Sequence, residues 1–142
     1  MGTNFIGAYN ITNAFANYIR ENKFSNIGAI IEIGSTSAWH GQTGSEIYAA
    51  SKSALQRMAS VQAAKFAKEK LIHLNTIVCG SIPTELLMQA PSGIEKLTNQ
   101  TPTGRLTTPE EVGEIAYFLI KNRCLNIVGA EIQIDGGRIL SL

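Results

Sequence analysis

The sequence predicts an α/β fold, the C-terminal part of a doubly wound parallel sheet, from two observations. Segments with helical periodicity alternate with short apolar runs of strand length, in the order α-β-α-β-α-β. Such alternation implies parallel strands joined by right-handed helical crossovers. The second observation is that no Gly-rich turn of the kind that binds a pyrophosphate at a helix N-terminus occurs in the sequence. We therefore expect one partial domain over residues 1–142 that lacks the N-terminal, Gly-rich half.

Two long segments have the periodicity of amphipathic helices. Residues 4–21 form the first, and residues 45–68 form the longest, with Ser45 as the expected N-cap. Each helix is expected to bury an apolar stripe, formed by Phe5, Ala8, Ile11, Phe15 and Ile19 on the first and by Ile47, Ala50, Ala54, Met58 and Val61 on the second.

A third helix is expected to begin sharply at Thr108 and to run to about Lys121. Thr108 is the expected N-cap, Pro109 fits the first helical position, and Glu111 completes a capping box. The stretch before this helix, residues 85–107, is expected to be irregular.

Three segments are expected to form strands. Residues 29–33 are an apolar run long enough for a buried strand, residues 71–78 are partly alternating and β-branched near their end, and residues 131–134 are the third. The carboxyl ends of parallel strands lie at one edge of the sheet, where open α/β sheets bind ligands. Ser35 follows the first of these strands, so we expect its hydroxyl to point into the crevice at that edge.

Composition and charge exclude several classes of function. With 44% hydrophobic and 16% charged residues and a net charge of +1, the chain reads as an ordinary globular protein without the basic stripe that nucleic acids or anionic membranes attract. It has no apolar run of membrane-spanning length and no signal-peptide pattern. Neither the cysteines, Cys79 and Cys124, nor the histidines, His40 and His73, have the spacing of metal ligands. We expect a cytoplasmic protein without a metal.

A Ser, a Tyr and a Lys are expected to converge at one spot. Tyr48 and Lys52 lie four residues apart on the longest helix and therefore share one face, and Ser35 lies at the end of the neighbouring strand. Taken singly, Ser35 is explained as well by a turn-capping hydroxyl, and Tyr48 and Lys52 by an ordinary amphipathic pair. Their joint order and spacing favour a catalytic site.

This arrangement resembles the catalytic signature of the short-chain dehydrogenase/reductase family, a Ser followed thirteen residues later by Tyr-x-x-x-Lys. Further segments resemble pieces of the same family in the same order, namely T-N-F-I-G, N-T-I-V-C-G-S-I-P-T, G-R-L-T-T-P-E-E-V and G-A-E-I-Q-I-D-G-G. The resemblance covers nearly all of the chain and looks closest to the reductases of 3-oxoacyl chains. It implies a Rossmann-type fold and an NAD(P)-dependent oxidoreductase that transfers a hydride between a nicotinamide and a small-molecule carbonyl or alcohol.

The resemblance also implies residue roles. Tyr48 would be the general acid in reduction and the base in oxidation, with Lys52 favouring its phenolate and binding the nicotinamide ribose. Ser35 would hydrogen-bond the substrate oxygen. Asn4 would hold a water that relays protons to Lys52, although from its position alone it serves equally well as a helix N-cap.

The cofactor implied is NAD or NADP, and the residues that would bind it are Tyr48, Lys52, Gly80, Ile82 and Thr84, the last three at its nicotinamide end. Cys79 stands where the family usually has Pro, so it is either a reactive thiol beside the nicotinamide or an inert buried one, of which the second is favoured. The substrate lid would lie at about residues 85–107, with Leu86, Leu87 and Met88 making it apolar.

Assembly and an alternative function complete the expectations. In the family, helices corresponding to residues 4–21 and 45–68 pair between subunits, so we expect a homo-oligomer. Residues 29–33 would form an exposed strand edge that favours association. The alternative is a truncated, non-catalytic remnant or an interaction module that cannot bind a cofactor alone, because the Gly-rich turn is missing.

Overall fold

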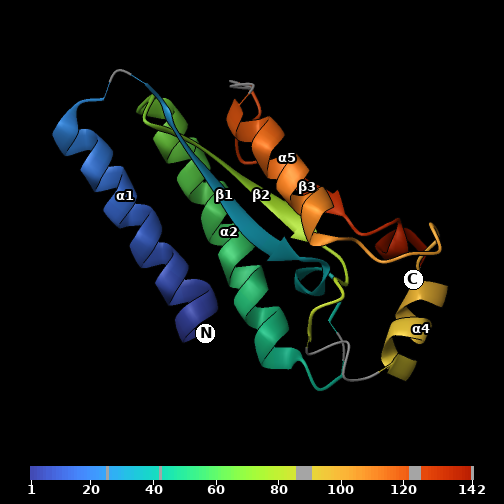
Figure 1. The fold of residues 1–142 in the computed structure, drawn as a ribbon. Coiled ribbons are helices and arrows are strands. Elements are labelled where there is room, and N and C mark those ends of the chain that lie inside the picture. Colours follow the sequence, from blue (N-terminus) through green and yellow to red (C-terminus); the bar gives the residue numbers. More distant parts are fainter. Residues whose placement is uncertain (25, 42, 86–90, 122–125, 142) are drawn as a thin grey trace.

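The computed structural model describes residues 1–24, 26–41, 43–85, 91–121 and 126–141 (Figure 1). A parallel sheet is built from three strands in the order β1-β2-β3, with bounds β1 Gly28–Ser35, β2 Ile72–Cys79 and β3 Glu131–Ile134. The α/β fold class and the parallel sheet expected from the sequence are confirmed. Each strand lies within one to two residues of its predicted bounds.

Helices cover both faces of the sheet (Figure 1). On one face lie α1 (Ala8–Asn22) and α2 (Glu46–Lys68), and on the other lies α5 (Pro109–Lys121). Each face has its own buried core. Below α1 and α2 the core is formed by Ala16, Ile19, Ala59, Ala63, Phe66, Ile72 and Leu74. Below α5 it is formed by Ile77, Cys79 and Leu119, with partly buried Ile, Val and Ala side chains around them.

The carboxyl ends of all three strands meet at one edge of the sheet. Ser35, the last residue of β1, lies opposite Cys79, the last residue of β2, and Cys79 lies opposite Ile134, the last residue of β3. This edge is where the loops that carry the candidate site leave the sheet.

The predicted start of the first helix is wrong, and of its predicted buried stripe only Ile19 is buried. The chain forms a π-helical turn over Gly2–Gly7 before α1 begins. The buried residues of α1 are Thr12, Ala16 and Ile19, whereas Ile11 is 73% exposed and Phe15 is 36% exposed. The periodicity identified an amphipathic helix, but the helix turns its small face toward α2 and leaves the larger apolar side chains beside the open edge of β1.

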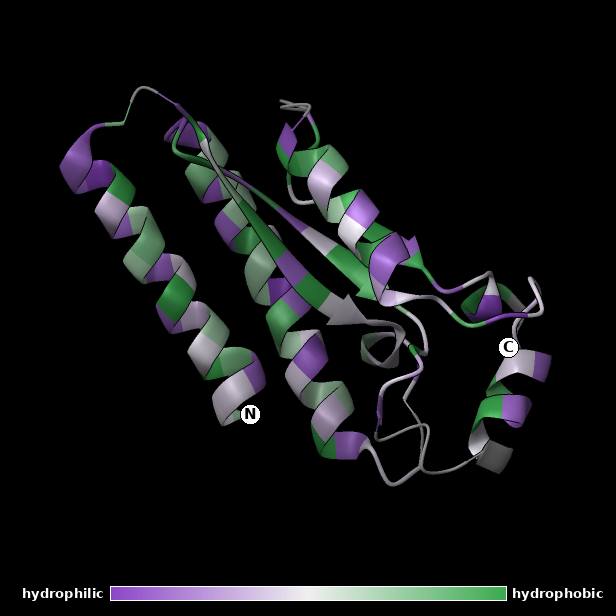
Figure 2. Cartoon of the chain, in the orientation of Figure 1, coloured by the Kyte–Doolittle hydropathy of each residue, from purple (hydrophilic) through white to green (hydrophobic). Residues whose placement is uncertain are grey.

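The predicted buried stripe of α2 is also wrong. Ile47 and Val61 are 71% and 65% exposed, and the hydrophobic colouring along the ribbon is not confined to the side facing the sheet (Figure 2). The buried face is instead formed by Ser51, Leu55, Gln56, Ala59, Gln62, Ala63 and Phe66. Small side chains and hydrogen-bonded glutamines allow α2 to approach the sheet closely, and a periodicity count of apolar residues overlooks them.

A helix lies where the sequence predicted irregular chain. Helix α4 spans Pro91–Asn99 inside the 85–107 stretch, and Thr101 Oγ donates to the Leu97 carbonyl just after its end. Its apolar residues Ile94 and Leu97 make only one pair at helical spacing, and so short a pattern is easily missed. Residues 86–88, which were expected to make the lid apolar, lie outside the described residues.

The capping box of α5 is confirmed. Glu111 Oε2 accepts a hydrogen bond from the Thr108 backbone N–H at 2.9 Å, and the Glu111 N–H donates to Thr108 Oγ at 3.3 Å. Arg105 forms two further bonds to the same carboxylate, at 2.6 and 2.9 Å. The hydrogen bonds from Arg105 and then from Thr108 lower the pKa of Glu111 from 4.5 to about 2.

This pairing predicts a pH-dependent stability difference between the wild type and Glu111→Gln. A depressed folded-state pKa adds stability above the unfolded pKa, near 4.5, and that stability is lost as the pH falls toward about 2. Urea midpoints should therefore differ most at pH 7, and the difference should shrink as the pH falls below 4.5 and approach zero only near pH 2. Glu110→Gln, at the neighbouring exposed position, is the matched control and should not show this convergence. A pH-independent gap for Glu111→Gln would contradict the assignment.

Candidate active site

Ser35 is placed at the carboxyl edge by the end of β1 and by a short helical turn. It is 8% exposed and N-caps the 3₁₀ turn Thr36–Ala38, with its Oγ accepting the Ser37 N–H at 3.1 Å. The turn-capping alternative for Ser35 is therefore correct as geometry. It does not remove the catalytic one, because a hydroxyl that accepts one bond keeps its own hydrogen to donate.

Lys52 reaches from α2 to the edge strand. Its Nζ donates to the Ile33 carbonyl at 2.7 Å and lies 6.0 Å from the centre of the Tyr48 ring. Burial lowers the pKa of Lys52, and the negative charges of Cys79, when ionised, and Glu32 oppose that shift. The structure thus brings Lys52 beside Tyr48 and next to the last residues of β1.

Tyr48 lies in the first turn of α2 with 44% of its surface exposed. Asn4 is joined to this turn through Ser51, since Asn4 Nδ2 donates to Ser51 Oγ at 3.1 Å and Ser51 Oγ donates to the Tyr48 carbonyl at 2.7 Å. Because Asn4 lies inside the π-helical turn, its alternative role as N-cap is wrong. Ser51, only 1% exposed, is a site residue that the sequence reasoning missed, although it directly precedes Lys52.

A second Tyr-x-x-x-Lys occurs on α5, at Tyr117 and Lys121. There the Lys Nζ is 4.9 Å from the Tyr ring centre, and the Tyr is 60% exposed. This pair lies at the end of α5, and the chain reaches the start of β3 shortly after it, so it is at the opposite end of the sheet from Ser35 (Figure 1). Of the two pairs, the one on α2 is bonded to β1 just before Ser35, through Lys52 and the Ile33 carbonyl.

The segment expected to meet the nicotinamide leaves β2 at the same edge. The Gly80 N–H donates to the Ile134 carbonyl at 2.9 Å, and a Cβ on Gly80 would lie 2.8 Å from the Asp135 Cα, so only glycine fits. Ile82 packs partly into the core below α5, and its carbonyl accepts the Thr84 N–H at 2.8 Å. Thr84 is exposed and can offer its hydroxyl to a ligand. These residues and Lys52 fit the nicotinamide end of a dinucleotide.

Cys79 is 4% exposed and points its thiol back toward the Ile77 carbonyl at 3.8 Å. Burial raises the pKa of this thiol, and the nearby positive charge of Lys52 partly opposes the shift. A buried, protonated thiol is inert, so the structure favours the inert alternative. Cys124 lies outside the described residues.

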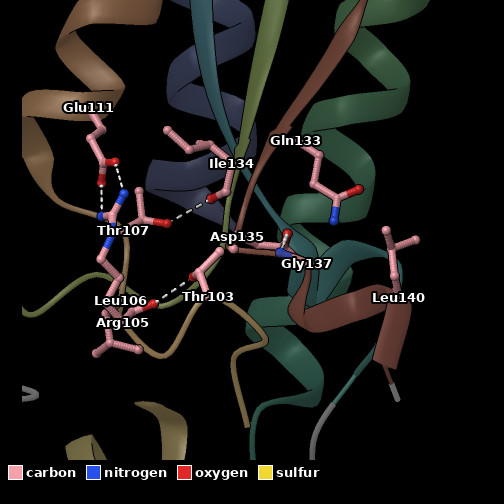
Figure 3. Close-up of a pocket in the computed structure, with 11 residues that line it drawn as sticks. Thr103, Arg105, Leu106, Thr107, Glu111, Gln133, Ile134, Asp135, Gly137 and Leu140 are labelled. Atoms are coloured by element: carbon pink, nitrogen blue, oxygen red, sulfur yellow. Dashed lines mark hydrogen bonds and ion pairs between the residues drawn. The ribbon is translucent and has the colours of Figure 1, made fainter. Parts of the chain in front are cut away.

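Cavities flank this site without containing its central residues. One of about 460 Å³ lies beyond the end of β3, where the Arg105–Glu111 pair and the Asp135 turn face it (Figure 3). A second, of about 550 Å³, opens between the loop after Ser35 and α4 and is lined by residues such as His40 and Lys96. A third, of about 600 Å³, is an apolar groove between α1 and the open edge of β1.

The described part of the chain holds no group of three or more His, Cys, Asp or Glu side chains that could bind a metal. No described helix is long and apolar enough to cross a membrane.

Comparison with known proteins adds three findings. A family model described as enoyl-(acyl carrier protein) reductase matches residues 1–138. The chain is 33% identical over 140 residues to an acetoacetyl-CoA reductase of Rhizobium meliloti (strain 1021), across 97% of this chain and 56% of that relative. It is 31% identical over 115 residues to the 3-oxoacyl-[acyl-carrier-protein] reductase FabG of Pseudomonas aeruginosa, across 80% of this chain and 46% of the relative.

Among solved structures, a gluconate 5-dehydrogenase from Burkholderia cenocepacia J2315 in complex with NADP and tartrate has a similar fold. The TM-score is 0.87 at 25% sequence identity, over 98% of this chain and 54% of that one. The chain thus spans about half the length of the curated relatives and solved structures that it matches.

Proposed function

The chain belongs to the short-chain dehydrogenase/reductase family, and we propose that it carries the proton-transfer site of an NAD(P)-dependent oxidoreductase acting on a carbonyl or alcohol. The observation that supports this proposal most is that Lys52, beside Tyr48 on α2, bonds the Ile33 carbonyl two residues before Ser35 at the carboxyl edge of the sheet. The second Tyr-x-x-x-Lys, on α5, lacks that setting.

A bound nicotinamide would supply or accept the hydride, and the residues of this chain would position the substrate and move the proton. Tyr48 would donate its phenolic proton to the substrate oxygen in reduction and take it back in oxidation. Ser35 would donate its free hydroxyl hydrogen to the same oxygen and stabilise the charge that develops there. Lys52 would place a positive charge next to the phenolate and hold the ribose hydroxyls.

Asn4 and Ser51 would position the turn of α2 that carries Tyr48 and Lys52. Their hydrogen bonds join the N-terminal π-helical turn to the turn of α2 between Tyr48 and Lys52. Holding that turn still keeps the phenol and the ammonium in register. The relay water assigned to Asn4 by the family resemblance stays a proposal.

We propose a 3-oxoacyl thioester as the substrate class, because two of the relatives are named as reductases of acetoacetyl-CoA and of 3-oxoacyl chains. The test uses a chimera in which the cofactor-binding half of the Rhizobium meliloti relative precedes residue 1 of this chain. The chimera should oxidise NADPH or NADH in the presence of acetoacetyl-CoA and not in its absence. A folded chimera that binds the cofactor but reduces no carbonyl compound would favour the non-catalytic alternative.

A further inference from the structure

We propose that Gln56 and Glu131 are positioning residues that fix the segment from Ser35 to Trp39 at the carboxyl edge of the sheet. Neither belongs to the Tyr-x-x-x-Lys motif, and they come from different elements, α2 and β3. The inference rests on the proposed function only for the role of Ser35, because the attachment itself is a property of the folded chain.

One end of the segment is held by Gln56, which is 3% exposed. Its Oε1 accepts the backbone N–H of Ser35 at 2.9 Å, and its Nε2 donates to Glu131 Oε2 at 3.2 Å. Both ends of the amide are therefore used, and the amide cannot rotate without losing one bond or the other. The Ser35 backbone is thereby fixed relative to α2, which carries Tyr48 and Lys52.

Gly34 makes room for this amide. A Cβ at position 34 would lie 2.7 Å from Gln56 Oε1 and 2.9 Å from Thr76 Cγ2. The amide side chain thus occupies the space next to the strand that any other residue at position 34 would fill.

The other end of the segment is held by Glu131 and by Ser53. Trp39 Nε1 donates to the same Glu131 Oε2 at 3.1 Å, and Ser53 Oγ donates to the Ala38 carbonyl at 2.8 Å. One carboxylate oxygen therefore receives the bonds from both Trp39 and Gln56. The segment is thus attached to α2 at Ser35 and Ala38, and to β3 at Trp39.

These attachments determine where the Ser35 hydroxyl can act. Its Oγ already accepts the Ser37 N–H inside the turn, so the direction of its remaining O–H depends on the backbone that Gln56 holds. If the turn were released from Gln56 and Glu131, Ser35 could move relative to α2 while Tyr48 and Lys52 stayed in place.

Hydrogen–deuterium exchange of the full chain, read on peptides covering residues 34–40, tests the proposal. Gln56→Leu should accelerate exchange of the Ser35 amide by about tenfold or more, because its acceptor is lost and the turn opens locally. Gln62→Leu is the matched control: it removes another buried glutamine of α2, whose Nε2 bonds Asn13 at 3.4 Å on the side facing α1. The control should leave residues 34–40 unchanged, and it should cost less thermal stability than Gln56→Leu, because Gln62 Oε1 is buried without a hydrogen-bond partner among the described residues.

Glu131 supplies a conservative rescue and a spectroscopic signal. Trp39 is the single tryptophan of the sequence, so its emission and its quenching by acrylamide report on the attachment. Glu131→Leu should raise the quenching and speed exchange in residues 34–40, whereas Glu131→Gln keeps an acceptor oxygen and should preserve both.

Three outcomes would overturn the proposal. They are unchanged exchange of residues 34–40 in Gln56→Leu, an equal acceleration of that exchange in Gln62→Leu, or equal increases of Trp39 quenching and of exchange in Glu131→Leu and Glu131→Gln. None of these readouts requires turnover. If these tests succeed and the chimera binds the cofactor but reduces no carbonyl compound, the proposed function is contradicted while the attachment stays established.

Discussion

Replacing Tyr48 by Phe is expected to lower the turnover of the chimera by roughly 10²–10⁴-fold, the usual contribution of a positioned general acid. The change removes only the phenolic hydrogen that would reach the substrate oxygen. The ring stays in the first turn of α2, and no described hydrogen bond of that turn uses the hydroxyl. Cofactor affinity should therefore stay nearly unchanged, as measured by a fluorescence titration with the reduced cofactor.

Lys52→Met should lower both the turnover and the cofactor affinity. It removes the positive charge beside the phenol and the group proposed to hold the ribose, and a hydrogen bond to a charged group is worth about 1.5–3 kcal/mol. Turnover should fall as in Tyr48→Phe, and the cofactor dissociation constant should rise by about tenfold or more.

The second Tyr-x-x-x-Lys provides matched controls. Tyr117→Phe and Lys121→Met make the same chemical changes on α5, at an exposed pair away from Ser35. Both should keep near-normal turnover and cofactor affinity. Near-normal activity of Tyr48→Phe, or equal losses of cofactor affinity in the Tyr48 and Lys52 variants, would show that the roles are wrongly assigned.

The second large effect concerns association of the 142-residue chain. Strand β1 is an edge of the described sheet and has an apolar groove beside it, and a flat edge of this kind pairs readily with other chains. On α2, the exposed side chains Ile47 and Val61 lie on a stripe that a second copy could cover. We expect the purified chain to be oligomeric at micromolar concentrations by size-exclusion chromatography with light scattering.

The double variant Ile47→Glu with Val61→Glu should lower the measured mass, because charges in the centre of such a contact repel and lose their hydration. Thermal stability of the single chain should change little, since both residues are largely exposed. Ile120→Glu is the control, because Ile120 is an apolar residue of α5 that is 53% exposed and lies across the sheet from α2 (Figure 1). A wild-type chain that stays a monodisperse monomer would contradict the expected association.

The strands and the order of elements could be predicted from the sequence because they depend on local patterns. The apolar run 29–33, the partly alternating segment 71–78 and the short segment 131–134 predicted the three strands, and the capping box at Thr108 and Glu111 predicted the start of α5. Patterns of this kind are read within a few residues and do not depend on what packs against the element.

The buried faces of α1 and α2 could not be predicted in the same way. Their large apolar residues, among them Ile11 and Val61, lie on faces that the single chain leaves open. The faces that are buried contain Thr12, Ser51, Gln56 and Gln62, whose polar groups find partners only in the folded chain. Which of two stripes is covered depends on tertiary contacts, which periodicity does not contain.

The part of the candidate site that forms a sequence motif could be predicted. Ser35, Tyr48 and Lys52 follow from spacing and family resemblance; the structure places Lys52 beside Tyr48 and bonds it to the Ile33 carbonyl, two residues before Ser35. Gln56 and Glu131 belong to no recognisable sequence motif. Glu131 bonds Trp39, which is 92 residues away in the sequence, so no local pattern predicts the contact. Residues of this kind can be identified only from the folded structure, in which β3 lies in register beside β2.

The most direct test of the central claim, that this chain holds the proton-transfer site for hydride transfer to a carbonyl, follows deuterium from the cofactor into the product. The chimera is supplied with acetoacetyl-CoA and with reduced cofactor deuterated at the transferable position, and the product is analysed by mass spectrometry. The account predicts one deuterium on the carbon that bore the ketone, with at least a hundredfold slower transfer (roughly the lower limit for a lost general acid) in Tyr48→Phe. Labelled product formed at the same rate by the Tyr48→Phe chimera, or no labelled product from a folded chimera that binds the cofactor, would contradict it.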